Sequence, residues 1–209
     1  MSTNPARVAV FLDYQNVFGI ARQCFGRRPA DRTDGQVDPL ALGRLIVSRR
    51  PHPSALSEVR VYRGLPDRTR DPRTHGAAQR QMAAWSRSPL VRVVARPLRY
   101  PRRWPAEPAQ EKGVDVALGI DFVRLAVQGA YDVGVLMSTD TDLVPALEAV
   151  LELTGVRVEV AAWRAKRANP RLSVGHDKPW CHHLGRADYD AVHDPTDYAP
   201  AAPAAPDRA

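Results

Sequence analysis

Acidic side chains follow two apolar segments that lie far apart in the sequence. Asp13 comes directly after residues 7–12, and Asp140 and Asp142 come shortly after residues 133–137. Clustered carboxylates repel one another unless a cation neutralises them, and ligation by oxygen alone suits Mg²⁺ or Mn²⁺. Such an ion can activate water and stabilise the leaving oxygen of a phosphodiester, so these acids indicate phosphodiester hydrolysis if they meet in space.

The elements that would position these acids are alternating strands and helices. Asp38 is a good N-cap and Gly155 a good stop for two of the helices. The predicted strands are residues 7–12, 58–63, 91–95, 133–137 and 156–161, and the predicted helices start near 16, span 39–47, end near 85, and span 113–128 and 143–153. This alternation predicts an α/β fold, a single doubly wound parallel sheet of about five strands with helices on both faces. Ligands bind such sheets beyond the carboxyl ends of the strands, where the acids would converge.

Each acid also has a purely structural interpretation. Asp140 or Asp142 could simply cap the helix that follows, and Asp13 could be a turn residue. Asp115 and Asp121 lie six positions apart on one predicted helix, which turns them about 120° from each other. Both therefore need not reach the same ion, and one of them could be a supporting or capping residue.

Two polar neighbours of these acids are further candidates. Asn16 has the reach to orient Asp13 or a metal-bound water, although it could instead be an N-cap. Lys112 precedes the helix that carries Asp115 and could pair with a carboxylate or a substrate phosphate. An exposed lysine at a helix start is the alternative.

A basic composition favours a polyanionic partner. The 209-residue chain has a formal net charge of +7 and a pI near 9.9. Two predicted loops emerge at the same sheet edge as the acids, and Tyr100 and Trp104 in the second could stack on bases. The loop arginines are Arg68, Arg70 and Arg73 in the first loop and Arg96, Arg99, Arg102 and Arg103 in the second. A solvated loop in an arginine-rich protein is the alternative to an RNA-binding rim.

Length and composition predict one domain and no membrane partner. No apolar run approaches the ~20 residues of a membrane span, and the two cysteines form no CxxC pair, so we expect a cytoplasmic protein. Residues 1–163 are the predicted domain, 164–193 a packed extension and 194–209 a disordered tail. The histidines of the extension match no familiar zinc spacing. A homo-oligomer is compatible with the sequence but is not indicated by it.

Several ordered motifs together resemble the NYN domain family, in particular its LabA-like branch. They are residues 12–16 (LDYQN), 112–116 (KGVDV) with Asp121, 138–145 (STDTDLVP) and 155–158 (GVRV). The resemblance spans residues 7–163 and implies a PIN-like nuclease fold with strand order 3-2-1-4-5 and an Mg²⁺- or Mn²⁺-dependent ribonuclease site. By matching position it implies Asp13, Asp121, Asp140 and Asp142 as the metal-binding acids, with Asp115 in a lysine-glycine-x-aspartate motif and Asn16 beside the first acid.

One position departs from the family pattern. The fourth-strand motif commonly begins Ser-Gly-Asp, whereas this chain has Thr139, and a β-branched residue restricts the backbone there. A catalytically silent RNA-binding or regulatory module is therefore the main alternative. A haloacid-dehalogenase-like phosphatase is disfavoured because Gln15 stands where its second acid is needed. Dinucleotide and nucleoside-triphosphate sites are disfavoured because no glycine-rich loop follows the first strand.

Overall fold

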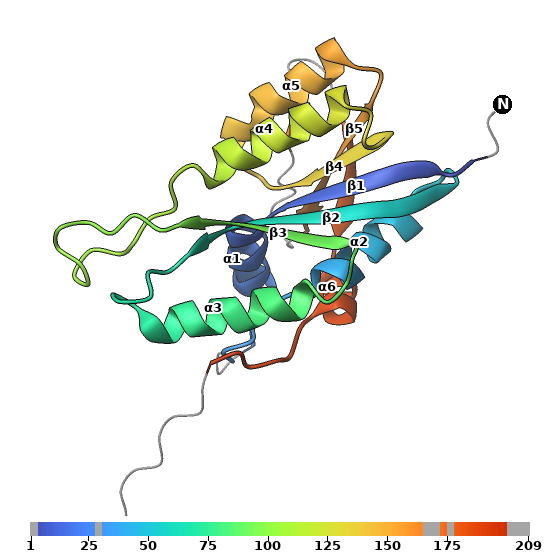
Figure 1. Cartoon of the computed structure of the whole chain (residues 1–209). Coiled ribbons are helices and arrows are strands. Elements are labelled where there is room, and N and C mark those ends of the chain that lie inside the picture. Colours follow the sequence, from blue (N-terminus) through green and yellow to red (C-terminus); the bar gives the residue numbers. More distant parts are fainter. Residues whose placement is uncertain (1–3, 28–30, 165–171, 175–177, 200–209) are drawn as a thin grey trace, which may run out of the picture.

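Six parallel strands form one sheet in the order β3-β2-β1-β4-β5-β6 (Figure 1). The computed structural model describes residues 4–27, 31–164, 172–174 and 178–199. The strands are β1 (Ala6–Asp13), β2 (Ser54–Leu65), β3 (Val91–Pro97), β4 (Val133–Met137), β5 (Arg157–Trp163) and β6 (Trp180–Leu184). The α/β class and the predicted order 3-2-1-4-5 are confirmed, and β6 adds one edge strand.

Helices cover both faces of the sheet, as expected for parallel strands joined by helical crossovers. The helices are α1 (Tyr14–Phe25), α2 (Pro39–Ser48), α3 (Pro72–Trp85), α4 (Val114–Val127), α5 (Val144–Leu153) and α6 (Arg186–Val192), with a short 3₁₀ turn, η1 (Thr141–Leu143). Figure 1 shows α4 and α5 together on one side and α1, α2, α3 and α6 on the other. Asp38 caps α2 by accepting a hydrogen bond from the amide of Ala41, as predicted.

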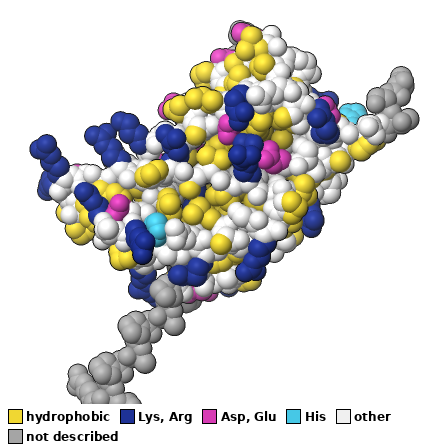
Figure 2. Space-filling view, in the orientation of Figure 1, with side chains coloured by type: hydrophobic (Ala, Val, Ile, Leu, Met, Phe, Trp, Pro, Cys, Tyr) yellow, Lys and Arg dark blue, Asp and Glu magenta, His cyan; other side chains and the backbone are white. Residues whose placement is uncertain are grey.

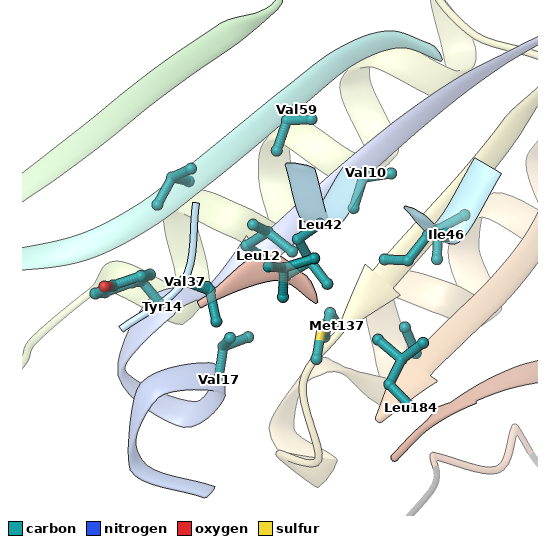
Figure 3. Close-up of a cluster of buried hydrophobic side chains, with 14 of the residues drawn as sticks. Val10, Leu12, Tyr14, Val17, Val37, Leu42, Ile46, Val59, Met137 and Leu184 are labelled. Atoms are coloured by element: carbon teal, nitrogen blue, oxygen red, sulfur yellow. The ribbon is translucent and has the colours of Figure 1, made fainter. Parts of the chain in front are cut away.

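The side chains of β1 divide the apolar core into two clusters. Val8, Val10 and Leu12 pack with α1 and α2, whereas Ala9 and Phe11 pack with α4 and α5. Successive strand residues point to opposite faces, so an uninterrupted apolar run is what a strand buried on both sides requires. Figure 3 shows the first cluster, in which Leu12 lies among side chains from several elements.

The segment after β5 joins the same sheet. Each residue of β6 pairs in parallel with β5, and His182 on β6 contacts Glu159 on β5 at 2.9 Å between Nε2 and Oε2. Arg50 reaches the same carboxylate, with Nη2 to Oε1 at 3.0 Å, and the side chains of all three residues are buried. The predicted packed extension therefore includes an edge strand. The sequence analysis missed it because its short, polar segment lacks a strand-like apolar pattern.

The predicted tail and the extension that contains the histidines lie only partly within the described residues. Residues 194–199 lie against α3, where Arg80 donates to the carbonyl oxygen of Tyr198 at 2.6 Å, and residues 200–209 are outside the described ranges. His176 also lies outside them. Within the described ranges, no three His, Cys, Asp or Glu side chains are grouped closely enough to hold a metal ion. In the same ranges no helix has the length and apolar character to cross a bilayer.

Candidate active site

Asp13 occupies the carboxyl end of the central strand and begins the following helix. It follows Leu12, which pairs in register with Met137 of β4, so the ends of β1 and β4 lie side by side. Its Oδ1 accepts the backbone N–H of Asn16 at 3.2 Å, and its Oδ2 accepts the Oγ–H of Ser138 at 2.8 Å. Asp13 thus caps α1 while its carboxylate is fixed from both sides.

Burial dominates the electrostatics of Asp13. The residue is only 4% exposed. Its pKa is raised from 3.8 to about 6, mainly by burial and to a smaller extent by the charges of Asp115 and Asp140. The hydrogen bonds from Ser138 and Asn16 act in the opposite direction. A carboxyl group with this environment favours protonation or a compensating cation.

Asp140 and Asp142 lie where β4 ends, as predicted. Asp140 is partly buried, and its Oδ1 accepts the backbone N–H of Asp142 at 2.9 Å at the start of η1. The backbone N–H of Asp140 donates to Ser138 Oγ at 3.1 Å. Ser138 therefore links the backbone of Asp140 directly to the carboxylate of Asp13. Asp140 therefore caps η1, and its backbone is also linked to Asp13 through Ser138.

Asp115 faces these acids. Its pKa is raised by burial first, then by the charges of Asp140 and Asp142, and its own charge raises the pKa of Asp13. Asp115 lies in the first turn of α4, two residues after Gly113. The φ of Gly113, 75°, falls in the left-handed region that favours glycine. The glycine of the lysine-glycine-x-aspartate motif therefore turns the chain into α4 where Asp115 can face the strand ends.

Asp121 is directed elsewhere on the same helix. Its carboxylate accepts hydrogen bonds from Arg60 Nη1 at 2.9 Å, the hydroxyl of Tyr62 at 2.9 Å and Arg124 Nη2 at 2.8 Å. Although burial raises its pKa, the hydrogen bonds from Arg124 and Tyr62 and the charges of Arg60 and Arg124 lower it overall. The charge of Asp115 therefore acts on Asp13, whereas the carboxylate of Asp121 is held by Arg60, Tyr62 and Arg124. The assignment of Asp121 as a metal ligand, which the resemblance implied, stays a prediction.

Asn16 and Thr139 bind each other across the strand ends. The Nδ2 of Asn16 donates to Thr139 Oγ1 at 3.1 Å, and the backbone N–H of Thr139 donates to Asn16 Oδ1 at 3.2 Å. Asn16 is thus not the N-cap of α1 but holds the loop after β4. No non-glycine residue in the described ranges has a positive φ, so Thr139 adopts a backbone conformation that does not require glycine.

Glu111 is a member of the site that the sequence analysis missed. Its Oε1 accepts the backbone N–H of Gly64 at 2.5 Å, and the side-chain amide of Gln15, in the orientation that satisfies both groups, donates to Oε1 at 2.9 Å. Burial raises the pKa of Glu111, and the charges of Asp13 and Asp115 raise it further. Its position directly before Lys112 and Gly113 was the available signal, but the preceding loop has no periodicity that would place it.

The predicted basic residues surround this end of the sheet. Figure 2 shows Lys and Arg side chains gathered over the end of the molecule that the β2–α3 and β3–α4 loops form. All of the basic residues named in the sequence analysis are exposed: Arg68, Arg70, Arg73, Arg96, Arg99, Arg102, Arg103 and Lys112. The aromatic residues of the second loop are engaged locally, because Tyr100 packs edge-on against Trp104 at 4.9 Å and lies under Arg70 at 5.2 Å. The predicted stacking of these two rings on bases stays a prediction.

The donor set suits a hard divalent cation. Four carboxylates from three segments, those of Asp13, Asp115, Asp140 and Asp142, offer oxygen ligands alone. The raised pKa values of Asp13 and Asp115 reflect, after burial, repulsion that a cation would relieve. Because no three such side chains among the described residues are already at a common ion-binding position, an ion would have to draw them together.

The chain resembles a known protein family. The model of the NYN domain matches residues 7–176. No curated protein matches the chain. Among solved structures, the chain is similar to a protein of unknown function from Vibrio parahaemolyticus RIMD 2210633, with a TM-score of 0.49 and 20% sequence identity, over 78% of this chain and 84% of that chain.

Proposed function

Because the chain belongs to the NYN domain family of the PIN-like nuclease superfamily, we propose that it is a metal-dependent endoribonuclease. One observation carries the proposal: Ser138 joins the buried carboxylate of Asp13 to the backbone of Asp140 where β1 and β4 end, and the charge of Asp115 acts on both acids. Carboxylates gathered in this way repel one another, and a divalent cation would relieve that repulsion. We assign Asp13, Asp115 and Asp140 as the ligands of Mg²⁺ or Mn²⁺, with the exposed Asp142 at the rim.

The neighbouring residues hold these ligands in place. Ser138 positions Asp13 by donating to its Oδ2, and Asn16 positions the loop that carries Asp140 by bonding both the amide and the hydroxyl of Thr139. When bound, the ion would lower the pKa of a water molecule and neutralise charge that develops on the phosphate. Fixing the acids beforehand reduces the ordering needed when substrate binds.

RNA is the proposed substrate because of the charge around the acids. Carboxylates repel a phosphodiester, and cationic side chains at the rim offset that repulsion. The exposed arginines of the two loops, together with Lys112 at the start of α4, supply the positive charge on the same end of the sheet. Binding to RNA should therefore weaken as salt concentration increases.

The test is cleavage of labelled RNA in the presence of Mn²⁺ or Mg²⁺, with a chelator as the metal-free condition. Asp13→Asn and Asp140→Asn should each reduce the rate by at least about 100-fold while the protein stays folded. Asp132→Asn is the matched control, since Asp132 precedes β4 at the opposite end of the sheet and pairs with Arg7 at 2.7 Å. Equal cleavage by the wild type and both site variants would refute the proposal.

A catalytically silent RNA-binding module is the alternative. The observation that favours it is that the described acids are not already grouped at ion-binding distance. It predicts salt-sensitive RNA binding without metal-dependent cleavage, and Asp13→Asn would then leave RNA affinity unchanged. Thr139 no longer favours this alternative, because its backbone conformation is one that non-glycine residues adopt.

A further inference from the structure

A cavity of about 580 Å³ opens directly beside the acid group. It lies between α1, α3, the carboxyl end of β2 and residues 197–199, and its lining includes Tyr14 and Gln15, the two residues that follow Asp13. Glu111 contributes to both places, because it lines the cavity and its pKa is raised by the charges of Asp13 and Asp115 after burial. A ligand that binds in the cavity would therefore extend to the proposed site of phosphodiester cleavage.

The walls of the cavity are largely apolar and fixed. Phe18 is partly exposed, and its ring stacks on Tyr14 with the centroids 6.2 Å apart. Ala77, Ala78 and Leu98 continue the apolar lining. Its volume falls within the roughly 300–1,000 Å³ typical of small-molecule sites. Apolar walls of this kind suit a flat ring system more than a hydrated, charged group.

Polar groups stand at defined positions in this apolar lining. Arg63 packs over Tyr14 and Trp85, with 5.3 Å and 5.7 Å from its guanidinium carbon to the ring centroids, and its Nη1 donates to Gln81 Oε1 at 2.6 Å. Gln15 and Glu111 add an amide and a carboxylate on the side next to Asp13. Amide, guanidinium and carboxylate groups can together pair with the donors and acceptors on the edge of a nucleobase.

We propose that this cavity is a nucleobase subsite, which takes the base of one unpaired nucleotide beside the scissile phosphate that a cation would hold at Asp13. That this phosphate is the one cleaved rests on the proposed ribonuclease function. A base can enter a cavity of this depth only when it is out of its stack and unpaired. The substrate class is therefore single-stranded RNA, or a loop or bulge, and not a continuous duplex.

Gly19 offers a way to fill the cavity without touching the acids. It lines the cavity from α1, and a Cβ added there would meet no atom within 4 Å. Leucine also has a higher helix propensity than glycine, so Gly19→Leu should fold at least as well as the wild type. Gly155→Leu is the control, because Gly155 precedes β5 at the opposite end of the sheet, does not line the cavity, and a Cβ added there would meet no atom within 4 Å.

The experiment measures binding of a short fluorescent single-stranded RNA by anisotropy, in a chelator so that no cleavage occurs. Each nucleotide is replaced in turn by an abasic ribose. For the wild type and Gly155→Leu, we expect a specific abasic position to weaken binding by about ten-fold or more. Gly19→Leu should bind the intact RNA about ten-fold more weakly and should be insensitive to that abasic position. Circular dichroism of each variant verifies that it is folded.

The outcomes separate this subsite from catalysis. If no abasic position matters and Gly19→Leu binds like Gly155→Leu, the subsite is refuted, even if Asp13→Asn abolishes cleavage and the ribonuclease proposal holds. If base-dependent binding is seen and lost in Gly19→Leu, the subsite stands, whether or not the protein cleaves RNA. Absence of any RNA binding, or binding of duplex RNA as tightly as single strands, would also overturn it.

Discussion

Replacing Asp13 by asparagine should stabilise the metal-free protein at neutral and higher pH. Burial, with smaller contributions from Asp115 and Asp140, raises the pKa of Asp13 from 3.8 to about 6. At about 1.4 kcal/mol per pH unit, this displacement corresponds to about 3 kcal/mol. Asparagine removes the charge, can still accept the backbone N–H of Asn16, and can form a hydrogen bond with Ser138.

The direction in which stability changes with pH follows from proton binding. Between pH 3.8 and about 6 the folded protein holds a proton on Asp13 that the unfolded chain has released. The folded state binds more protons there, so the stability contributed by this group falls as the pH increases through that window. It is fully present below 3.8, and the loss is complete above about 6.

Urea unfolding of the wild type and Asp13→Asn, with a chelator present, measures this effect. The free energy of unfolding of the variant relative to the wild type should increase by up to about 3 kcal/mol between about pH 4 and about pH 8. Any packing defect of asparagine is present at both pH values and so cancels from the change. Asp132→Asn should show a small change of opposite sign, because hydrogen bonds from Arg7 lower the pKa of Asp132.

Metal provides a second arm of the same experiment. Mn²⁺ or Mg²⁺ should stabilise the wild type at about pH 8 and have less effect on Asp13→Asn, since a cation binds the ionised carboxylate. A difference between the two proteins that is the same at both pH values would refute the reasoning about burial. Equal stabilisation of both proteins by metal would refute the assignment of Asp13 as a ligand.

Three further variants test other parts of the structure. Asp121→Asn should lower the free energy of unfolding by about 1–3 kcal/mol, because Arg60 loses a charged partner, and RNA cleavage should persist; loss of cleavage at unchanged stability would place Asp121 in the site. Glu159→Gln should lower the free energy of unfolding by about 3–5 kcal/mol near neutral pH. His182 and Arg50 lower the pKa of Glu159 to about 2 against the effect of burial, so this loss should shrink in acid as the wild-type carboxylate becomes protonated. A loss that does not change with pH in urea unfolding would contradict this. Thr139→Gly should cost about 1–2 kcal/mol and leave the cleavage rate within about two-fold, whereas a large rate increase would mean that this side chain obstructs the site.

The sequence determined the framework of this protein. Apolar segments that alternate with helical ones predicted five of the six strands and their parallel arrangement, and the family resemblance implied their order. Asp13 and Asp140 could be placed because each follows the end of such a segment, and the carboxyl ends of adjacent parallel strands meet at one edge. The family resemblance was confirmed by the NYN domain match.

Only the tertiary structure showed how the two aspartates of α4 are placed. Helical periodicity showed that Asp115 and Asp121 point in different directions, but not which one faces the strand ends. The answer depends on β2, whose Arg60 and Tyr62 capture Asp121 although they lie about sixty positions away in sequence. Whether a carboxylate is paired with other side chains depends on such distant neighbours, which no local sequence pattern encodes.

The same limit applied to β6 and to the cavity. The segment Trp180–Leu184 becomes a strand because it pairs with β5 and places His182 against the buried Glu159. The cavity exists because α1, α3, the end of β2 and residues 197–199 leave space between them, with Glu111 at its edge. Strand pairing at a sheet edge and the shape of unfilled space arise from contacts between remote segments, so they became visible only when the chain was folded.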